Sequence, residues 1–155
     1  MKKHLIVDID GTIADLSHRL HHINGSSRKD WDAFFAACKY DRVHVDVVTI
    51  IKDLAARGNK PIHFITGRSN VVYQETLDWL YNEAGFLSYD FTLFMRNHGD
   101  HRTDDIVKHE LYNRNLWPRG VVPKTTLAVF EDRDRVVQMW RSMGFRVLQI
   151  ANGEF

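Results

Sequence analysis

The sequence predicts an α/β fold in which an open, mainly parallel sheet is covered by helices on both faces. Short apolar runs rich in branched residues recur along the chain, and segments with helical periodicity separate them. Strands that alternate with helices pair in parallel, because each helix carries the chain back across the sheet. A length of 155 residues suits one domain, which we expect to span residues 1–155 and to bury a continuous core.

Five apolar segments are expected to form the strands. The second of them is entered through Gly58-Asn59-Lys60, a sequence typical of a turn. In chain order, the expected strands are residues 4–9, 61–65, 91–95, 126–130 and 146–150.

Four segments between these strands have the spacing of amphipathic helices. Residues 46–56 repeat apolar side chains at helical intervals, and Gly58 follows as glycine commonly does after a helix. The remaining helices are expected at residues 70–84, 104–116 and 133–143, and the first and last of these end near Gly85 and Gly144.

Residues 14–40 interrupt the alternation. They contain several histidines and a Gly-Ser-Ser turn, followed by a short helical pattern with Trp31, Phe34 and Phe35. Because this segment is too short for a separate domain, we expect a flap and helical excursion over the site.

Composition and charge limit the classes of protein that this chain can represent. The net charge is +1, so any contact with nucleic acid has to be local. Cys38 is the only cysteine, which excludes an intramolecular disulfide, and its apolar neighbours favour a buried position. No stretch is long enough to span a membrane, and Asp8 and Asp10 interrupt the first apolar run before it reaches the length of a signal peptide. We therefore expect a soluble, cytoplasmic protein.

Asp8 and Asp10 are the most informative residues of the chain. They stand at the end of the first expected strand, where alternating side chains place both carboxylates on one face. Such a pair needs a compensating charge, usually a divalent cation or a reacting group. In the alternative interpretation, Asp10-Gly11 is only a turn in which the aspartate binds its own backbone.

Polar residues also follow two other expected strands. Thr66-Gly67-Arg68 comes after the second strand, and Glu131-Asp132 comes after the fourth. Because the carboxyl ends of parallel strands meet at one edge, where such sheets bind ligands, these residues are expected to form one site with Asp8 and Asp10.

The motif set resembles that of the haloacid dehalogenase superfamily of phosphotransferases. It comprises Asp8-x-Asp10-Gly-Thr12, Thr66 after a strand, Lys108 in a later helix and Glu131-Asp132 after another strand. The order and spacing match over essentially the whole chain. This resemblance implies a Rossmann-like domain with a minimal cap and a metal-dependent phosphatase activity.

The chain is similar, more specifically, to the 3′-phosphatase domain of phage polynucleotide kinase-phosphatase. Residues 102–110, residues 131–141 and the ending Gly153-Glu154-Phe155 carry this resemblance. It implies a phosphatase for 3′-phosphorylated nucleic-acid ends or nucleotides, with a separate kinase or ligase as a partner. Two features depart from that family: Glu131 stands where it has aspartate, and the chain has no Gly-x-x-x-x-Gly-Lys-Ser/Thr loop of a kinase.

The resemblance implies catalytic and metal-binding roles for the carboxylates. Asp8 would be the nucleophile, and Asp10 the general acid and base, with a pKa raised by desolvation and by negative neighbours. We expect Mg²⁺ to be held by Asp8, Asp132 and a main-chain oxygen near Asp10, because magnesium prefers a few hard oxygen ligands. Glu131 would reach the ion through water or stabilise Lys108 instead.

Other residues are expected to hold the substrate phosphate. Thr66 offers a hydroxyl donor and Lys108 a fixed cation. Asp104 lies one helical turn before Lys108, so it can orient the ammonium; the alternative is a solvated surface pair. The remaining expected phosphate- or substrate-binding residues are Gly67, Arg68 and Arg19. For each arginine, pairing with a surface carboxylate is the alternative.

A locally basic loop precedes Asp104 and contains Arg96, His98, His101 and Arg102. On a nearly neutral protein, such a loop is a candidate lip for binding a nucleic-acid strand.

Two further patterns leave alternatives open. His18 and His22 have the spacing of a zinc pair, but no third ligand can be identified. The four tryptophans fall mostly in helical apolar patterns, which favours core packing, whereas Trp31 and Tyr40 in the excursion could stack on a base.

The rival functions are a phosphatase for free nucleotides or small metabolites, and a non-catalytic binding domain that keeps the scaffold. The second is disfavoured because every expected catalytic side chain is present.

Overall fold

The computed structural model describes residues 3–25 and 27–153 and contains a five-stranded sheet whose strands all run parallel. The strands are β1 (His4–Val7), β4 (Ile62–Ser69), β5 (Phe91–Arg96), β6 (Thr126–Glu131) and β7 (Val147–Gln149). Their order in space is β5-β4-β1-β6-β7, so the first strand lies in the centre and the chain winds outward from it in both directions. This topology confirms the predicted parallel sheet and places the switch point of the winding at the end of β1.

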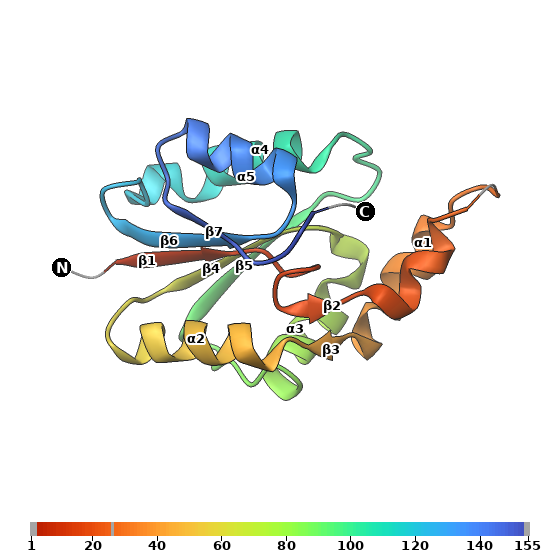
Figure 1. Cartoon of the computed structure of the whole chain (residues 1–155), viewed down its shortest axis with the longest axis horizontal. Helices are drawn as coiled ribbons and strands as arrows, with labels where there is room; N and C mark the ends of the chain where they lie inside the picture. Colours follow the sequence, from red (N-terminus) through yellow and green to blue (C-terminus); the bar gives the residue numbers. More distant parts are fainter. Residues whose placement is uncertain (1–2, 26, 154–155) are drawn as a thin grey trace.

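Two helices cover each face of the sheet (Figure 1). Helices α2 (Val45–Ala56) and α3 (Tyr73–Asn82) lie on one face, and α4 (Asp104–Asn115) and α5 (Asp134–Ser142) on the other. The alternation of strand side chains divides the core accordingly: Val7 packs in one apolar cluster with Trp79 of α3, and Ile6 packs in the other with Trp140 of α5. A strand buried on both faces explains why β1 reads as an uninterrupted apolar run.

Strand boundaries differ from the prediction where the site begins. Strand β1 ends at Val7, and the chain turns four residues later at Gly11, whose φ is 80°. Strand β4 continues to Ser69, with an irregularity in its pairing between Thr66 and Ser69. Thr66, Gly67 and Arg68, which were expected after this strand, therefore lie within its last residues rather than in a loop.

The segment between β1 and α2 forms the excursion at the carboxyl end of the sheet. Strand β2 (Ala14–Asp15) pairs antiparallel with β3 (Arg42–Val43), and together they close the base of the segment. Between them lie the 3-10 helix η1 (Ser17–His22), helix α1 (Trp31–Ala36) and the 3-10 helix η2 (Ala37–Tyr40). Figure 1 shows α1 projecting beyond the layers at the end of the molecule.

The prediction that the tryptophans pack in the core is correct for only some of them. Trp79 and Trp140 are almost fully buried, and Cys38 is buried as expected. The prediction is wrong for Trp117, which is 59% exposed. Helix α4 ends at Asn115 and Leu116 takes the buried position, so Trp117 begins a separate turn that faces solvent. Across the described ranges, the helices are too short or too polar for any of them to cross a bilayer.

Candidate active site

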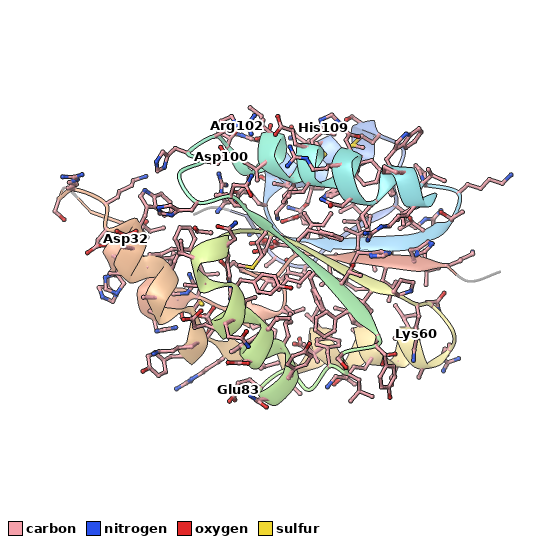
Figure 2. All side chains as sticks on the ribbon, turned by 180° about the vertical axis from the view of Figure 1, so that it is seen from behind. Asp32, Lys60, Glu83, Asp100, Arg102 and His109 are labelled. Atoms are coloured by element: carbon pink, nitrogen blue, oxygen red, sulfur yellow. The ribbon has the colours of Figure 1, made fainter. Side chains whose placement is uncertain are left out.

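A cleft of about 740 Å³ opens at the carboxyl edge of the sheet. Its inner end is formed by residues at the ends of β1 and β6 and in the first turns of α4. Helix α1 and the loop of residues 97–103 line its outer part. Figure 2 shows Asp32 of α1 and Asp100 of this loop at the same end of the molecule. The polar clusters that follow separate strands in the sequence therefore meet at one site.

Two buried charged groups lie at or behind the inner end of this cleft, and the first is the carboxylate cluster, which consists of Asp8, Lys108, Glu131 and Asp132. The Lys108 ammonium donates to Asp8 Oδ1 at 2.6 Å and to Glu131 Oε2 at 2.8 Å. The Thr12 hydroxyl lies 3.2 Å from Asp8 Oδ2 and 3.4 Å from Asp132 Oδ1, and thus joins the two aspartates. Three buried carboxylates face one ammonium, so the cluster carries excess negative charge.

Burial and this excess negative charge raise the pKa values of the two aspartates in the cluster. Burial raises the pKa of Asp8 to about 7, the charge of Glu131 adds to this, and Lys108 opposes it. Burial and the neighbouring charge of Asp8 likewise raise the pKa of Asp132 to about 7. Burial would lower the pKa of Lys108, but Asp8 and Glu131 raise it above its ordinary value, so the amine stays protonated. A further cation beside Asp8 and Asp132 would relieve the repulsion.

The carboxylate cluster fits a divalent metal ion of the Mg²⁺ type. Single oxygens of Asp8, Glu131 and Asp132 all lie within 4.8 Å of one another. Glu131 uses Oε2 for Lys108 and Oε1 for the backbone amides of Asp132 and Arg133, at 3.2 and 3.4 Å. The aspartates keep more of their oxygen lone pairs available, and hard carboxylate oxygens are the donors that magnesium prefers.

The second group is the arginine cluster, which consists of Asp10, Asp41, Arg19 and Arg68. Asp10 Oδ1 accepts from Arg19 Nη2 at 2.7 Å and from Arg68 Nε at 2.8 Å. Asp41 Oδ2 accepts from the Nη2 atoms of both arginines at 2.7 Å, and its Oδ1 accepts from Arg19 Nε at 2.8 Å. Both guanidinium groups are fully buried. Two carboxylates and two guanidiniums therefore neutralise each other within the protein.

The contacts within the arginine cluster differ from those expected for its members. Arg19 and Arg68 were expected to reach the substrate, but they are directed at Asp10 and Asp41. Burial alone would raise the pKa of Asp10, but the charges of Arg68 and Arg19 lower it overall. The expected raised pKa of Asp10 is thus wrong for this arrangement, because two cations share its carboxylate. Asp41 was missed, since nothing in its polar surroundings marks it as buried.

Asp104 lies elsewhere than expected. Its carboxylate accepts from Arg96 and from Arg133 Nη1, the latter at 2.6 Å, whereas Lys108 donates to the carboxylate cluster. The charge of Asp104 still adds to the raised pKa of Lys108 from a greater distance. Gly67 permits this position, because a Cβ on residue 67 would lie 2.6 Å from Asp104 Oδ1.

Thr66 is fully buried in β4 and is not among the residues that line the cleft; its Oγ1 accepts from the backbone amide of Arg68 at 3.1 Å. This contact uses a lone pair of the hydroxyl and leaves its hydrogen available for a phosphate oxygen.

The basic loop is mostly occupied by internal contacts. Arg96 is 8% exposed and donates to the carbonyls of Gly67, Asp100 and Arg102, at distances between 2.6 and 3.0 Å. Arg102 binds Asp100 and forms a bidentate pair with Glu110. The predicted basic lip is therefore wrong for Arg96, which holds the loop, and its other arginine is already paired.

The structure bears on two alternatives for the excursion, a zinc site at His18 and His22 and a stacking role for Trp31 or Tyr40. His18 Nε2 lies 2.8 Å from Asp41 Oδ1, and the only group in the described ranges with metal-binding spacing contains no histidine. Tyr40 is 69% exposed and lies outside the cleft, whereas Trp31 lines it.

Structures of haloacid dehalogenase-like proteins share this fold. A hydrolase of that family from Streptococcus pneumoniae superposes with a TM-score of 0.65 at 12% identity, over 97% of this chain and 87% of the other. A family enzyme from Bacteroides thetaiotaomicron, in complex with magnesium and inorganic phosphate, gives a TM-score of 0.57 at 12% identity, over 100% and 97%. The fold is accordingly of the haloacid dehalogenase class.

Within this class, the family model of the polynucleotide kinase PNKP phosphatase domain matches residues 2–155. The chain belongs to this family of phosphatase domains, as the sequence motifs predicted.

Two relatives of this chain are longer proteins. A predicted bifunctional polynucleotide kinase/RNA ligase of Autographa californica nuclear polyhedrosis virus is 33% identical over 139 residues, which are 90% of this chain and 18% of that one. A chain in the Pnkp1/Rnl/Hen1 complex is 27% identical with a TM-score of 0.78, over 100% of this chain and 47% of that one. This chain thus spans less than half the length of either relative.

Proposed function

We propose that this protein is a Mg²⁺-dependent phosphomonoesterase that removes a 3′-phosphate from a nucleic-acid end or a nucleotide through an aspartyl-phosphate on Asp8. The observation that carries this proposal is the carboxylate cluster, in which Asp8 lies between Lys108 and Asp132 at the inner end of a cleft. Membership in the PNKP phosphatase family supports it independently.

In the first half of the reaction, an Asp8 oxygen forms a bond to phosphorus while the bond from phosphorus to the 3′-oxygen breaks. Lys108 and the Thr66 hydroxyl hold the phosphoryl oxygens, and Asp10, two residues from Asp8, in its protonated form donates its proton to the leaving 3′-oxygen. In the second half, Asp10 takes a proton from water, the water oxygen bonds to phosphorus, and the bond to Asp8 breaks. The enzyme then returns to its starting state.

Mg²⁺ would be held by Asp8 and Asp132. When bound, the ion would screen the repulsion between the carboxylate nucleophile and the phosphate dianion. Glu131 contributes mainly by fixing Lys108, because both of its oxygens already accept hydrogen bonds.

A phosphatase for free nucleotides or small metabolites is the second candidate. It is favoured by one observation: Arg102 is paired with Asp100 and Glu110, so the loop before α4 offers little free positive charge to a long strand.

The proposed biological setting is the repair of nucleic-acid ends, beside a separate kinase or ligase. One relative is a predicted kinase/ligase, and another belongs to a Pnkp1/Rnl/Hen1 RNA repair complex.

Phosphate release from four substrate classes would test the function. With Mg²⁺, we expect 3′-phosphorylated DNA or RNA oligonucleotides to exceed sugar phosphates in kcat/KM, with no turnover in chelator and suppression by excess Ca²⁺. Higher kcat/KM for mononucleotides than for oligonucleotides would select the second candidate. Full activity in chelator would overturn the metal requirement.

A further inference from the structure

The outer cleft contains an aromatic wall, formed by Trp31, Phe34 and Phe35 of α1. The Asp30 side chain accepts from the Ala33 amide at 2.9 Å and so fixes the start of this helix directly before Trp31. Positions three and four residues apart lie on one side of a helix, which brings the rings together. Trp31 packs edge-on against Phe34 and stacks with Phe35, with ring centres 5.7 and 5.9 Å apart.

This wall is joined directly to the reacting end of the cleft. The Arg19 guanidinium lies over the Phe34 ring at 4.2 Å and donates to Asp10 Oδ1 at 2.7 Å. The ring of Phe34 in turn touches Trp31. Only two side chains therefore separate Trp31 from the carboxylate beside Asp8, and both are held by buried contacts.

Trp31 is the exposed member of the wall. Phe34 is buried, whereas Trp31 is 41% exposed and lines the cleft. An indole that core packing does not need, open to a cleft much larger than a phosphate ion, has the properties of a stacking surface. The Lys29 ammonium lies 5.6 Å from the ring centre, and its exposed side chain can turn towards a neighbouring phosphate.

We propose that Trp31 is a specificity-determining residue that stacks on the base of the nucleotide carrying the 3′-phosphate. This inference rests on the proposed function and adds to it the group that the site recognises beyond the phosphate. Base stacking on an aromatic side chain tolerates every base, so the site would require a nucleobase without reading its identity.

The test compares two short oligonucleotides that end in a 3′-phosphate, one with a terminal adenosine and one with a terminal abasic sugar. We expect the wild-type protein to prefer the adenosine substrate by at least about fivefold in kcat/KM, mainly through KM. Trp31→Ala should bring this ratio close to one, and Trp31→Phe should keep most of it. Trp117→Ala is the matched control, because Trp117 is an exposed tryptophan outside the cleft.

The outcomes distinguish this inference from the function on which it rests. Hydrolysis of both substrates with equal efficiency by the wild-type protein would overturn the stacking role and leave the phosphatase intact. A preference that survives in folded Trp31→Ala, with native circular dichroism, would also overturn it. No hydrolysis of either substrate would overturn the proposed function itself.

Discussion

The two buried charge clusters lie side by side, joined through the short segment from Asp8 to Asp10, yet their charge balance differs. The arginine cluster has two carboxylates and two guanidiniums, and every charged group in it has an internal partner. The carboxylate cluster has three carboxylates and one ammonium, and the pKa values of Asp8 and Asp132 are raised to about 7.

This difference separates a supporting role from a binding role. Paired buried charges hold a geometry, and they need no ligand to do so. An unbalanced buried group is stable only if it takes up protons or binds a cation, which makes it responsive to its surroundings. We infer that the arginine cluster positions Asp10 and the excursion, while the carboxylate cluster binds and reacts.

Asp8→Asn should have the largest effect. Asparagine keeps the volume of Asp8 but cannot form the bond to phosphorus, so kcat should fall at least about 1000-fold, or about 4 kcal/mol in barrier. The measurement is steady-state phosphate release from a 3′-phosphorylated oligonucleotide. Unfolding in chelator should show no loss of stability, since the substitution removes one repelling charge. A variant that keeps more than about a tenth of the rate would remove Asp8 from the nucleophile role.

Arg68→Met should act chiefly on stability. It leaves Asp10 and Asp41 buried with one guanidinium between them, and breaking such a group costs about 3 kcal/mol of unfolding free energy. Urea denaturation measures the loss, with the exposed Arg57→Met as the control. A second substitution, Asp41→Asn, should recover part of the stability lost in Arg68→Met. A loss below about 1 kcal/mol from Arg68→Met alone would show that the cluster is not held by charge balance.

Mg²⁺ should stabilise the protein through the carboxylate cluster alone. At ten times its dissociation constant, the ion should add about 1.4 kcal/mol to the free energy of unfolding. Asp132→Asn should abolish this gain, while Glu131→Gln should reduce it less, because Glu131 already binds Lys108 and two amides. Urea titrations at several Mg²⁺ concentrations provide the measurement. The reverse order of the two variants would assign the metal to Glu131.

A third buried polar group lies at the amino edge of the sheet, and it differs from the two charge clusters because it contains no carboxylate. His63 Nε2 lies 3.1 Å from His4 Nδ1, and its Nδ1 lies 2.8 Å from Thr92 Oγ1. Burial lowers the pKa of His63 from 6.5 to about 3, and the charges of His4 and Arg119 add to this.

The folded protein thus keeps His63 neutral at pH values where the unfolded chain takes up a proton. The free energy of unfolding should therefore fall as the pH drops below 6.5, by about 1 kcal/mol between pH 7 and 5.5. His63→Gln should remove this part of the pH dependence, whereas the exposed His98→Gln should not. Equal slopes for wild type and His63→Gln would show that His63 is not held neutral.

Pattern alone located the strands, the helices and the edge at which the site forms. Asp8, Gly67 and Asp132, which all line the cleft, can be grouped from the sequence because alternating strands and helices place the carboxyl ends of parallel strands together. Lys108 entered the same site through the family resemblance, and it does contact Asp8.

The pairing of the buried charges was decided only by the tertiary structure. Sequence reasoning assigned Arg19 and Arg68 to the substrate, and it gave Asp41 no role. Residues 19, 41 and 68 come from different elements, and which carboxylate neutralises which arginine depends on distances of a few ångströms that no local pattern encodes.

The sequence by itself therefore determined which strand ends contribute polar groups to the cleft, since periodicity fixes the face and the end of each element. Only the tertiary structure decided that the carboxylate cluster has excess negative charge while the charges of the arginine cluster balance one another. The physical reason is that burial follows from local patterns of apolar residues, whereas electrostatic balance is a property of all charges within a few ångströms, whatever their separation along the chain.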